Sequence, residues 1–104
     1  MEQGLIISLR FTAFNIEYHS TCRYDHLTIT DGVDGSTLME KSCGDTTSYG
    51  ILVGGQSIGF ILPADITSTS NIVKLVFKTD NAGTRSGWSV SWSAVIPGQS
   101  QKYV

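Results

Sequence analysis

Alternation of apolar and polar residues with a period of two is the feature that most constrains this fold. In "GWSVSWSAV", residues 87–95, the side chains of Trp88, Val90, Trp92 and Ala94 alternate with serines. This pattern predicts a β-strand with one apolar face and one polar face. Because no stretch keeps the 3.6-residue period of an amphipathic helix, we expect an all-β fold.

The same period occurs near the start of the chain. Residues 7–11 carry apolar side chains at every second position, and the apolar phase then shifts by one residue to Phe14 and Ile16. A shift of this kind predicts a β-bulge, here near Ala13.

Two more segments have strand character. Residues 27–30 alternate leucine and isoleucine with threonine, and "IVKLVFKTD", residues 72–80, is predicted to be a mostly buried strand. The residues expected on the core face of this second strand are Val73, Leu75 and Phe77, and those expected on the other face are Lys74 and Lys78. Short strands separated by Gly-, Asp- and Ser-rich turns predict an antiparallel β-sandwich.

Residues 49–65, "YGILVGGQSIGFILPAD", fit a simple strand poorly. Two apolar clusters flank Gly54 and Gly55, so the segment is too rich in glycine for a good strand and too apolar for a free loop. One interpretation is a hairpin or loop laid over the core. The other is an exposed apolar lip that contacts a partner.

Composition excludes several classes of function. The chain has 104 residues, enough for one domain, and a net charge of -2 without a basic stripe, which argues against nucleic-acid binding. No run approaches the ~20 apolar residues of a membrane span. The opening "MEQGLIISL" lacks the basic start and the cleavage site of a signal peptide, so we expect an added start, a mature fragment or an intracellular chain.

Cys22 and Cys43 are the only cysteines. A bridge between them would stabilise the fold by roughly 3 kcal/mol, and two buried reduced thiols are the alternative. Together with His19 and His26 they could also form a zinc site, since nitrogen and sulfur donors suit that ion. We favour solvated histidines on a polar face.

Two short motifs have weak support. "GQSIG", residues 55–59, matches the nucleophile elbow of serine hydrolases, but that elbow requires a strand-to-helix turn in a longer α/β chain, so we do not assign catalysis to Ser57. "DGVDG", residues 31–35, lacks the remaining donors of an EF-hand loop and is predicted to be a hairpin turn.

A calcium site could be distributed over three loops. Glu17 follows the first predicted strand, Asp25 precedes the second, and Asp80 ends the long strand at "FKTDN". Calcium takes six to eight oxygen ligands, and carboxylates brought together would repel one another without a cation. On spacing alone, scattered solvated acids are the simpler interpretation.

The order of distant elements resembles that of a CUB domain, an extracellular antiparallel β-sandwich module of jelly-roll type. The similarity rests on three stretches: "LRFTAFNIEYHSTCRYDHLTITDG", "SCG" and "LVFKTDNAGTRSGWSVSW". The matching elements are Phe14, Glu17, Cys22, Tyr24-Asp25, Asp31-Gly32, Cys43-Gly44, Phe77 to Asp80, and Gly87-Trp88.

This resemblance implies a disulfide between Cys22 and Cys43. It also implies that Glu17, Asp25 and Asp80 are the acidic ligands of the calcium-binding subset of the family, with a backbone oxygen near Asn81 and a water. The metal ligands expected here are therefore Glu17, Asp25, Asp80 and Asn81, with Ca2+ as the cofactor.

In that subset, the acidic side chains also contact a lysine of a protein partner, with the tyrosine of the aromatic-Asp pair beside it. The ligand-binding residues implied are Tyr24, Glu17, Asp25 and Asp80. Thr79 stands where some members have a ligand-contacting side chain, so that contribution is not carried over. Such an interaction should weaken with salt, as exposed ion pairs do.

The chain departs from the family pattern at its start. A complete CUB domain begins with further strands and a first disulfide, and this chain has neither, so the fold is expected to be N-terminally incomplete. Open sheet edges invite strand addition, so the absent strands would come from upstream in a longer parent or from a neighbouring molecule, which allows a homo-oligomer.

We therefore expect a single CUB-like domain over residues 1–96 and a tail or linker over 97–104. The expected function is a secreted, non-enzymatic, calcium-binding protein–protein interaction module that could self-assemble through open sheet edges. The alternatives are a calcium-independent adhesion or carbohydrate-binding module, or an accessory domain of a secreted protease.

Overall fold

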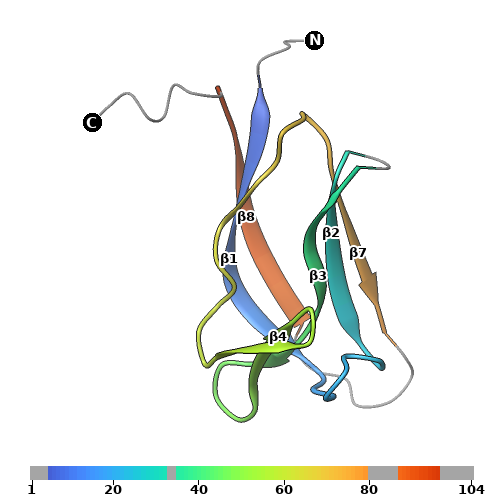
Figure 1. Cartoon of the computed structure of the whole chain (residues 1–104). Coiled ribbons are helices and arrows are strands. Elements are labelled where there is room, and N and C mark those ends of the chain that lie inside the picture. Colours follow the sequence, from blue (N-terminus) through green and yellow to red (C-terminus); the bar gives the residue numbers. More distant parts are fainter. Residues whose placement is uncertain (1–4, 33–34, 80–86, 97–104) are drawn as a thin grey trace.

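The chain forms eight described β-strands and no described helix (Figure 1), as the period-two pattern predicts. The computed structural model describes residues 5–32, 35–79 and 87–96. The strands are β1 (Ile6–Ile16), β2 (His26–Asp31), β3 (Thr37–Asp45), β4 (Gly50–Val53), β5 (Gln56–Gly59), β6 (Ile66–Thr67), β7 (Val73–Lys78) and β8 (Gly87–Val95). The predicted tail 97–104 and the middle of the predicted turn, residues 33–34, lie outside the described residues.

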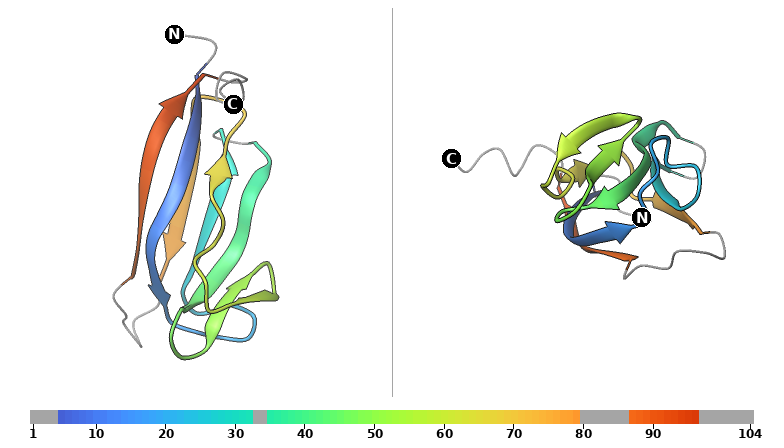
Figure 2. Two further views of the ribbon diagram at one scale, coloured as in Figure 1. Left: turned by 90° about the vertical axis from the view of Figure 1, so that its left-hand side faces the viewer. Right: turned by 90° about the horizontal axis from the view of Figure 1, so that it is seen from below.

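The strands make two facing layers, seen in Figures 1 and 2. In one layer β1 pairs with β8 along most of its length and with β6 at its other edge. The other layer has the order β7-β2-β3-β4-β5, and every pairing is antiparallel. Strand β1 reaches the second layer only at its end, where Asn15 and Ile16 pair with Asp45 and Gly44 of β3. The predicted antiparallel β-sandwich is confirmed.

The core lies between the layers and is apolar. The β1–β8 register shifts between Phe11 and Ala13, so the predicted bulge is confirmed and both Phe11 and Phe14 point inward. Their rings meet edge to face at 5.7 Å, a favoured arrangement for aromatic pairs. The buried residues are Leu9, Phe11, Phe14, Ile16, Cys22, Leu27, Ile29, Met39, Cys43, Ile51 and Leu52.

Strand β7 is more exposed than its sequence predicts. Val76 on its outer face and Phe77 on its core face are both substantially exposed, so the expectation of a mostly buried strand is wrong. The reason is position: among the described residues β7 pairs only with β2, and β8 pairs only with β1. Across the sandwich the two strands meet where Phe77 contacts Trp88, with ring centroids 5.9 Å apart.

Within residues 49–65 the predicted hairpin is confirmed, and the contact of an apolar lip with a partner stays a prediction. Strands β4 and β5 form a hairpin whose turn is Gly54-Gly55, with φ of 60° and 84° that glycine adopts without strain. The hairpin covers part of the core, but Phe60 and Ile61 just beyond it are 58% and 64% exposed.

Strands β3 and β4 approach closely at Gly44. Its φ is +104°, and a Cβ there would collide with the carbonyl oxygen of Gly50. The pairing of Gly44 with Ile51 therefore requires glycine on two grounds, its backbone conformation and the space available.

Two buried aspartates accept hydrogen bonds from nearby loops. Asp31 accepts hydrogen bonds from the backbone N–H and hydroxyl of Thr69 at 2.8 and 2.6 Å and from the hydroxyl of Ser70 at 2.8 Å. These bonds, those of Thr69 first, hold the pKa of Asp31 below its usual range. One carboxylate oxygen of Asp45 accepts three backbone N–H bonds from residues 47–49, which closes the β3–β4 turn.

Candidate functional site

One end of the sandwich holds Glu17 and Asp25, two of the predicted site residues, and the end of strand β7. Strand β1 ends at Ile16, β2 begins at His26, and the register pairs His26 with Lys78, the last residue of β7. Glu17, Asp25 and the end of β7 therefore lie at the same end of the molecule, the lower end in Figure 1.

Two of the four predicted calcium ligands can be placed there. Asp25 is 5% exposed and Glu17 is half-buried, and both make interactions with other parts of the chain. Asp80 and Asn81 lie outside the described residues. Within the residues that the structure describes, no group of three His, Cys, Asp or Glu side chains is arranged to hold a metal. The donor chemistry of Asp25 and Glu17, carboxylate oxygens in partly dry surroundings, suits calcium.

The loop between β1 and β2 is anchored by the disulfide Cys22–Cys43, whose Cα atoms are 5.5 Å apart. The implied bridge is present, which rules out the zinc alternative because both sulfurs are consumed. Cys22 is the only described non-glycine residue with positive φ, 54°, and its N–H donates to the carbonyl of His19 at 2.9 Å. The bridge thus holds a tight turn in a conformation that L-residues seldom adopt.

Tyr24 belongs to this loop and is 44% exposed. The ring of His19 contacts it edge to face with centroids 4.5 Å apart, and the guanidinium of Arg23 lies over it at 5.8 Å. The amide and hydroxyl of Thr21 both lie 3.0 Å from Nδ1 of His19. The ring of the exposed tyrosine is therefore contacted by both His19 and Arg23.

Sequence reasoning missed the roles of His19 and Arg23. His19 was expected to be a solvated histidine, yet its ring supports Tyr24. Arg23 carried no signal beyond its place between Cys22 and Tyr24. Their contact with the tyrosine depends on the turn that the disulfide imposes, and no local pattern encodes it.

His26 is also not a solvated histidine, because only 9% of it is exposed. Burial lowers its pKa, and the positive charge of Lys41 lowers it further, followed by that of Lys78. The imidazole therefore resists protonation in the folded chain, and two ammonium groups lie close enough to influence it.

The serine-hydrolase motif does not form a nucleophile elbow. Ser57 lies within β5, a short strand of an antiparallel hairpin, and its hydroxyl accepts the N–H of Gly59 at 3.3 Å. No strand-to-helix turn follows it in the described chain, so "GQSIG" lacks the geometry of that catalytic motif.

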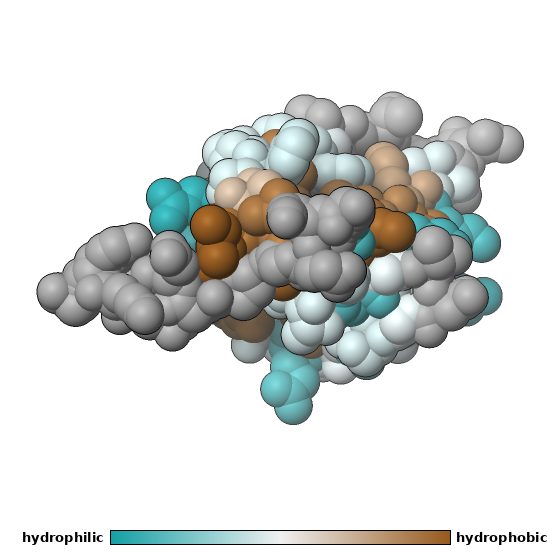
Figure 3. Space-filling view, turned by 90° about the horizontal axis from the view of Figure 1, so that it is seen from above, coloured by the Kyte–Doolittle hydropathy of each residue, from teal (hydrophilic) through white to brown (hydrophobic). Residues whose placement is uncertain are grey.

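A second feature is an apolar opening between β7 and β8. A cavity of about 240 Å³ is lined by Ile7, Leu9, Val73, Leu75, Val90 and Trp92. Trp92 lies opposite Leu9 in the register, so it belongs to the core face, yet it is 68% exposed. Figure 3 shows apolar residues across the end of the sandwich opposite to Glu17 and Asp25.

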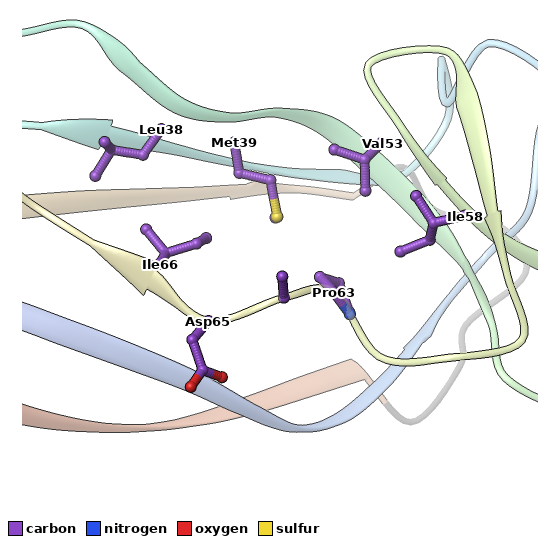
Figure 4. A pocket seen from close by; sticks show the side chains of 8 residues that line it. Leu38, Met39, Val53, Ile58, Pro63, Asp65 and Ile66 are labelled. Carbon is purple, nitrogen blue, oxygen red and sulfur yellow. The ribbon is translucent and has the colours of Figure 1, made fainter. Parts of the chain in front are cut away.

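A third feature is a shallow apolar pocket of about 290 Å³ beside the β4–β5 hairpin. In Figure 4 the side chains of Met39, Ile58 and Ile66 point toward one another, whereas Asp65 points away. The carboxylate of Asp65 instead forms an exposed ion pair with Arg10, 3.2 Å apart. The pocket is an indentation of the core surface without polar groups that converge on it.

Comparison with known proteins identifies the class of this fold. A family model described as CUB domain matches residues 1–92, and the chain belongs to that family. It is 30% identical to cubilin of Rattus norvegicus over 95 residues, 91% of this chain and 2% of cubilin. It is 31% identical to tolloid-like protein 1 of Mus musculus over 93 residues, 88% of this chain and 8% of that protein.

An astacin-like metalloendopeptidase of Gallus gallus is 30% identical over 90 residues, 85% of this chain and 18% of the relative. The chain thus spans a small part of each of these relatives. The described residues contain no helix with the length and hydrophobicity needed to cross a membrane.

Proposed function

We propose that this CUB domain is an extracellular, calcium-dependent protein-interaction module that captures a lysine side chain of its partner. The observation that carries the proposal is the register, which brings Glu17, Asp25 and the end of β7 to one end of the sandwich. Asp80 and Asn81 follow β7 directly in the sequence and would complete the ligand set.

Each residue has a distinct part in this proposal. Glu17, Asp25, Asp80 and Asn81 would hold the ion through oxygen atoms. A bound calcium would supply the positive charge that lets three carboxylates share one site. The carboxylates also accept the partner's ammonium, a compact cation, and the exposed ring of Tyr24 lies along its aliphatic stem.

Calcium binding is tested by calorimetric titration of the metal-free protein. We expect one site, together with a rise in melting temperature on adding calcium. Asp80→Ala should abolish both effects, whereas Asp65→Ala removes a carboxylate from an exposed ion pair with Arg10 and should leave both intact. The absence of heat and of a thermal shift in the unmodified chain would overturn the calcium proposal.

Lysine capture is tested with a peptide that carries one lysine and a matched peptide that carries norleucine instead. Binding of the lysine peptide should require calcium and should weaken as ionic strength rises. Equal binding of the two peptides, or binding that survives a chelator, would favour the calcium-independent adhesion or carbohydrate-binding alternative.

The extracellular assignment is supported by the disulfide, because such bonds persist in oxidising compartments. A role as the accessory domain of a protease is the alternative that the metalloendopeptidase relative favours. A non-catalytic CUB domain fits either setting, and the two differ in the parent protein rather than in these residues.

A second candidate function is self-assembly through the edge of β8. This strand carries no charged residue and no proline to block pairing, whereas β7 carries Lys74 and Lys78. The stretch "WSVSW" is the same in both directions, so two antiparallel copies centred on Val90 would place Trp88 of each opposite Trp92 of the other. Aromatic pairs across strands are favourable, and Trp92 is already exposed.

The experiment is light scattering coupled to size-exclusion chromatography over a hundredfold range of protein concentration. We expect a dimer that the double variant Ser89→Lys with Ser91→Lys converts to a monomer, because these two exposed positions would lie opposite each other across the new pairing, where like charges repel. A stable, soluble monomer at every concentration would refute self-assembly and leave the edge for a strand from another molecule.

A further inference from the structure

Two tyrosine rings of this chain lie face to face. The ring centroids of Tyr18 and Tyr49 are 4.8 Å apart and the ring planes differ by 13°, so the two rings are stacked. Tyr18 lies in the loop between β1 and β2, and Tyr49 lies in the turn between β3 and β4. The stack therefore joins two segments that are far apart in the sequence.

The backbone holds both rings in place. Tyr18 comes two residues after Ile16, which pairs with Gly44 of β3. The N–H of Tyr49 donates to Oδ1 of Asp45 at 3.1 Å, and it is one of three such bonds that close the β3–β4 turn. Strand pairing and the closed turn thus bring the two rings together, and the stack does not depend on a free loop.

The two rings differ in their access to solvent. Tyr49 is 61% exposed, whereas Tyr18 is half-buried and packs against the hydrophobic core. Tyr49 is therefore the outer ring of the pair, and a reagent in solution meets it first.

Tyrosines in contact can be joined by oxidation. A phenol that loses one electron and its hydroxyl proton becomes a phenoxyl radical, whose unpaired electron is shared between the oxygen and the ring carbons ortho to it. Two such radicals form a carbon–carbon bond between ortho carbons. The hydrogen on each of these carbons then moves to the oxygen, which restores both phenols. One molecule of hydrogen peroxide takes up the two electrons and two protons and becomes two molecules of water.

The geometry favours coupling within this pair. Radicals on separate molecules couple only when they collide, whereas two rings held face to face react in a unimolecular step. Tyr24, the other tyrosine that the structure describes, has His19 and Arg23 as its ring neighbours. The disulfide of this chain is a bond that persists in oxidising compartments, where peroxide chemistry is possible.

We propose that Tyr18 and Tyr49 form an oxidative cross-linking site, at which a haem peroxidase with hydrogen peroxide joins the two rings into dityrosine. The peroxidase takes both electrons from the exposed ring of Tyr49, and the first radical passes to Tyr18 through the stack before the second one forms. The new bond fastens the β1–β2 loop, which carries Tyr24, to the β3–β4 turn. Thiols cleave the Cys22–Cys43 disulfide of the same loop but do not cleave this bond.

The test treats the full chain, at low concentration, with a haem peroxidase and an equimolar amount of hydrogen peroxide. We expect a monomer that has lost two hydrogen atoms and shows the fluorescence of dityrosine. Trypsin places Tyr18 in the peptide of residues 11–23 and Tyr49 in that of residues 42–74. The disulfide joins these two peptides before reduction, so they should stay joined after reduction only where dityrosine has formed.

Phenylalanine variants separate the cross-link from simple stacking. Tyr18→Phe and Tyr49→Phe each keep an aromatic ring in the stack but remove one phenol, so each should abolish the joined peptides while melting close to the unmodified chain. Tyr24→Phe is the matched control, because it removes a phenol that is 44% exposed and has no stacked tyrosine. Its yield of joined peptides should equal that of the unmodified chain.

A second readout is thermal melting after reduction. The cross-linked chain should keep most of the melting temperature that the reduced chain loses, because the new bond closes a loop that includes the loop of the disulfide. Treatment that yields no dityrosine, dityrosine between molecules only, or joined peptides that contain Tyr24 or Tyr103 in place of this pair would overturn the proposal. So would joined peptides that survive in Tyr49→Phe.

Discussion

Breaking the Cys22–Cys43 disulfide should lower the stability of this domain substantially. The bridge closes a loop with a sequence separation of 21 and ties the turn that carries Arg23 and Tyr24 to strand β3. Closing a loop of that length removes enough freedom from the unfolded chain to stabilise the fold by about 3 kcal/mol. For a chain of 104 residues, this corresponds to a fall in melting temperature of about 15 °C.

Substitution should cost more than reduction. The side chains of Cys22 and Cys43 are almost completely buried, so replacing both by alanine also leaves small voids that cost about 1 kcal/mol each. Because Cys22 has a φ of 54°, the pair Cys22→Gly with Cys43→Ala should be about 1 kcal/mol more stable than the pair of alanines.

The assay is urea unfolding followed by far-UV circular dichroism, on the oxidised chain, the reduced chain and the two double variants. We expect the free energy of unfolding to be highest for the oxidised chain, lower for the reduced chain, lower again for the glycine variant and lowest for the alanine variant. If reduction changed the free energy of unfolding by less than about 1 kcal/mol, the loop-entropy argument would be refuted for this bridge.

Three further predictions concern single positions. Gly44→Ala should lower the free energy of unfolding by at least about 2 kcal/mol in thermal melts, because its Cβ meets a carbonyl oxygen of β4. Gly55 also has a left-handed backbone conformation but has open space around it, so Gly55→Ala should cost about 1 kcal/mol. Similar losses for the two variants would contradict the steric argument. The hydrogen bonds that hold the pKa of Asp31 below its ordinary 3.8 stabilise the fold above that pH, and this stabilisation is lost as the pH falls through 3.8 toward the folded-state pKa. In urea unfolding at a series of pH values, the free energy of unfolding should therefore fall less steeply in acid for Asp31→Asn than for the unmodified chain. An unchanged acid dependence would argue against this role of Asp31. Trp92→Ser should change the free energy of unfolding of the monomer by less than about 1 kcal/mol because the side chain is largely exposed, whereas Trp88→Ala should lower it by about 3 kcal/mol. A larger loss for Trp92→Ser than for Trp88→Ala in urea titrations would show that Trp92 packs in the core.

The strands were predictable because their period is local. Alternation over residues 87–95 places Trp88 and Val90 on the core face, and the one-residue slip before Phe14 appears as a bulge in the register. Such patterns depend on side chains within one strand, so they survive without knowledge of the partner strand.

Exposure was less predictable because it depends on what covers each strand. The pattern assigns Trp92 and Phe77 to the core face correctly, yet both are substantially exposed, Trp92 at the opening between β7 and β8. The order of strands decides this, and alternation within a strand carries no information on strand order.

The candidate site was likewise predictable only in part. Family resemblance leads to the disulfide and to Glu17, Asp25 and Tyr24, because their spacing is part of the motif. The contact of Arg23 with Tyr24 arises from a left-handed turn at Cys22. A positive φ at a residue other than glycine is not encoded by any local composition.

The two tryptophans give the domain a built-in optical readout. Trp88 is half-buried against the ring of Phe77, whereas Trp92 faces solvent across the apolar opening. Iodide in solution should therefore quench the emission of Trp92 and largely spare that of Trp88. A strand that docks along β8 would shield Trp92 and shift its emission to the blue, and unfolding of the core would expose Trp88. One unlabelled sample thus distinguishes occupation of the sheet edge from loss of the fold.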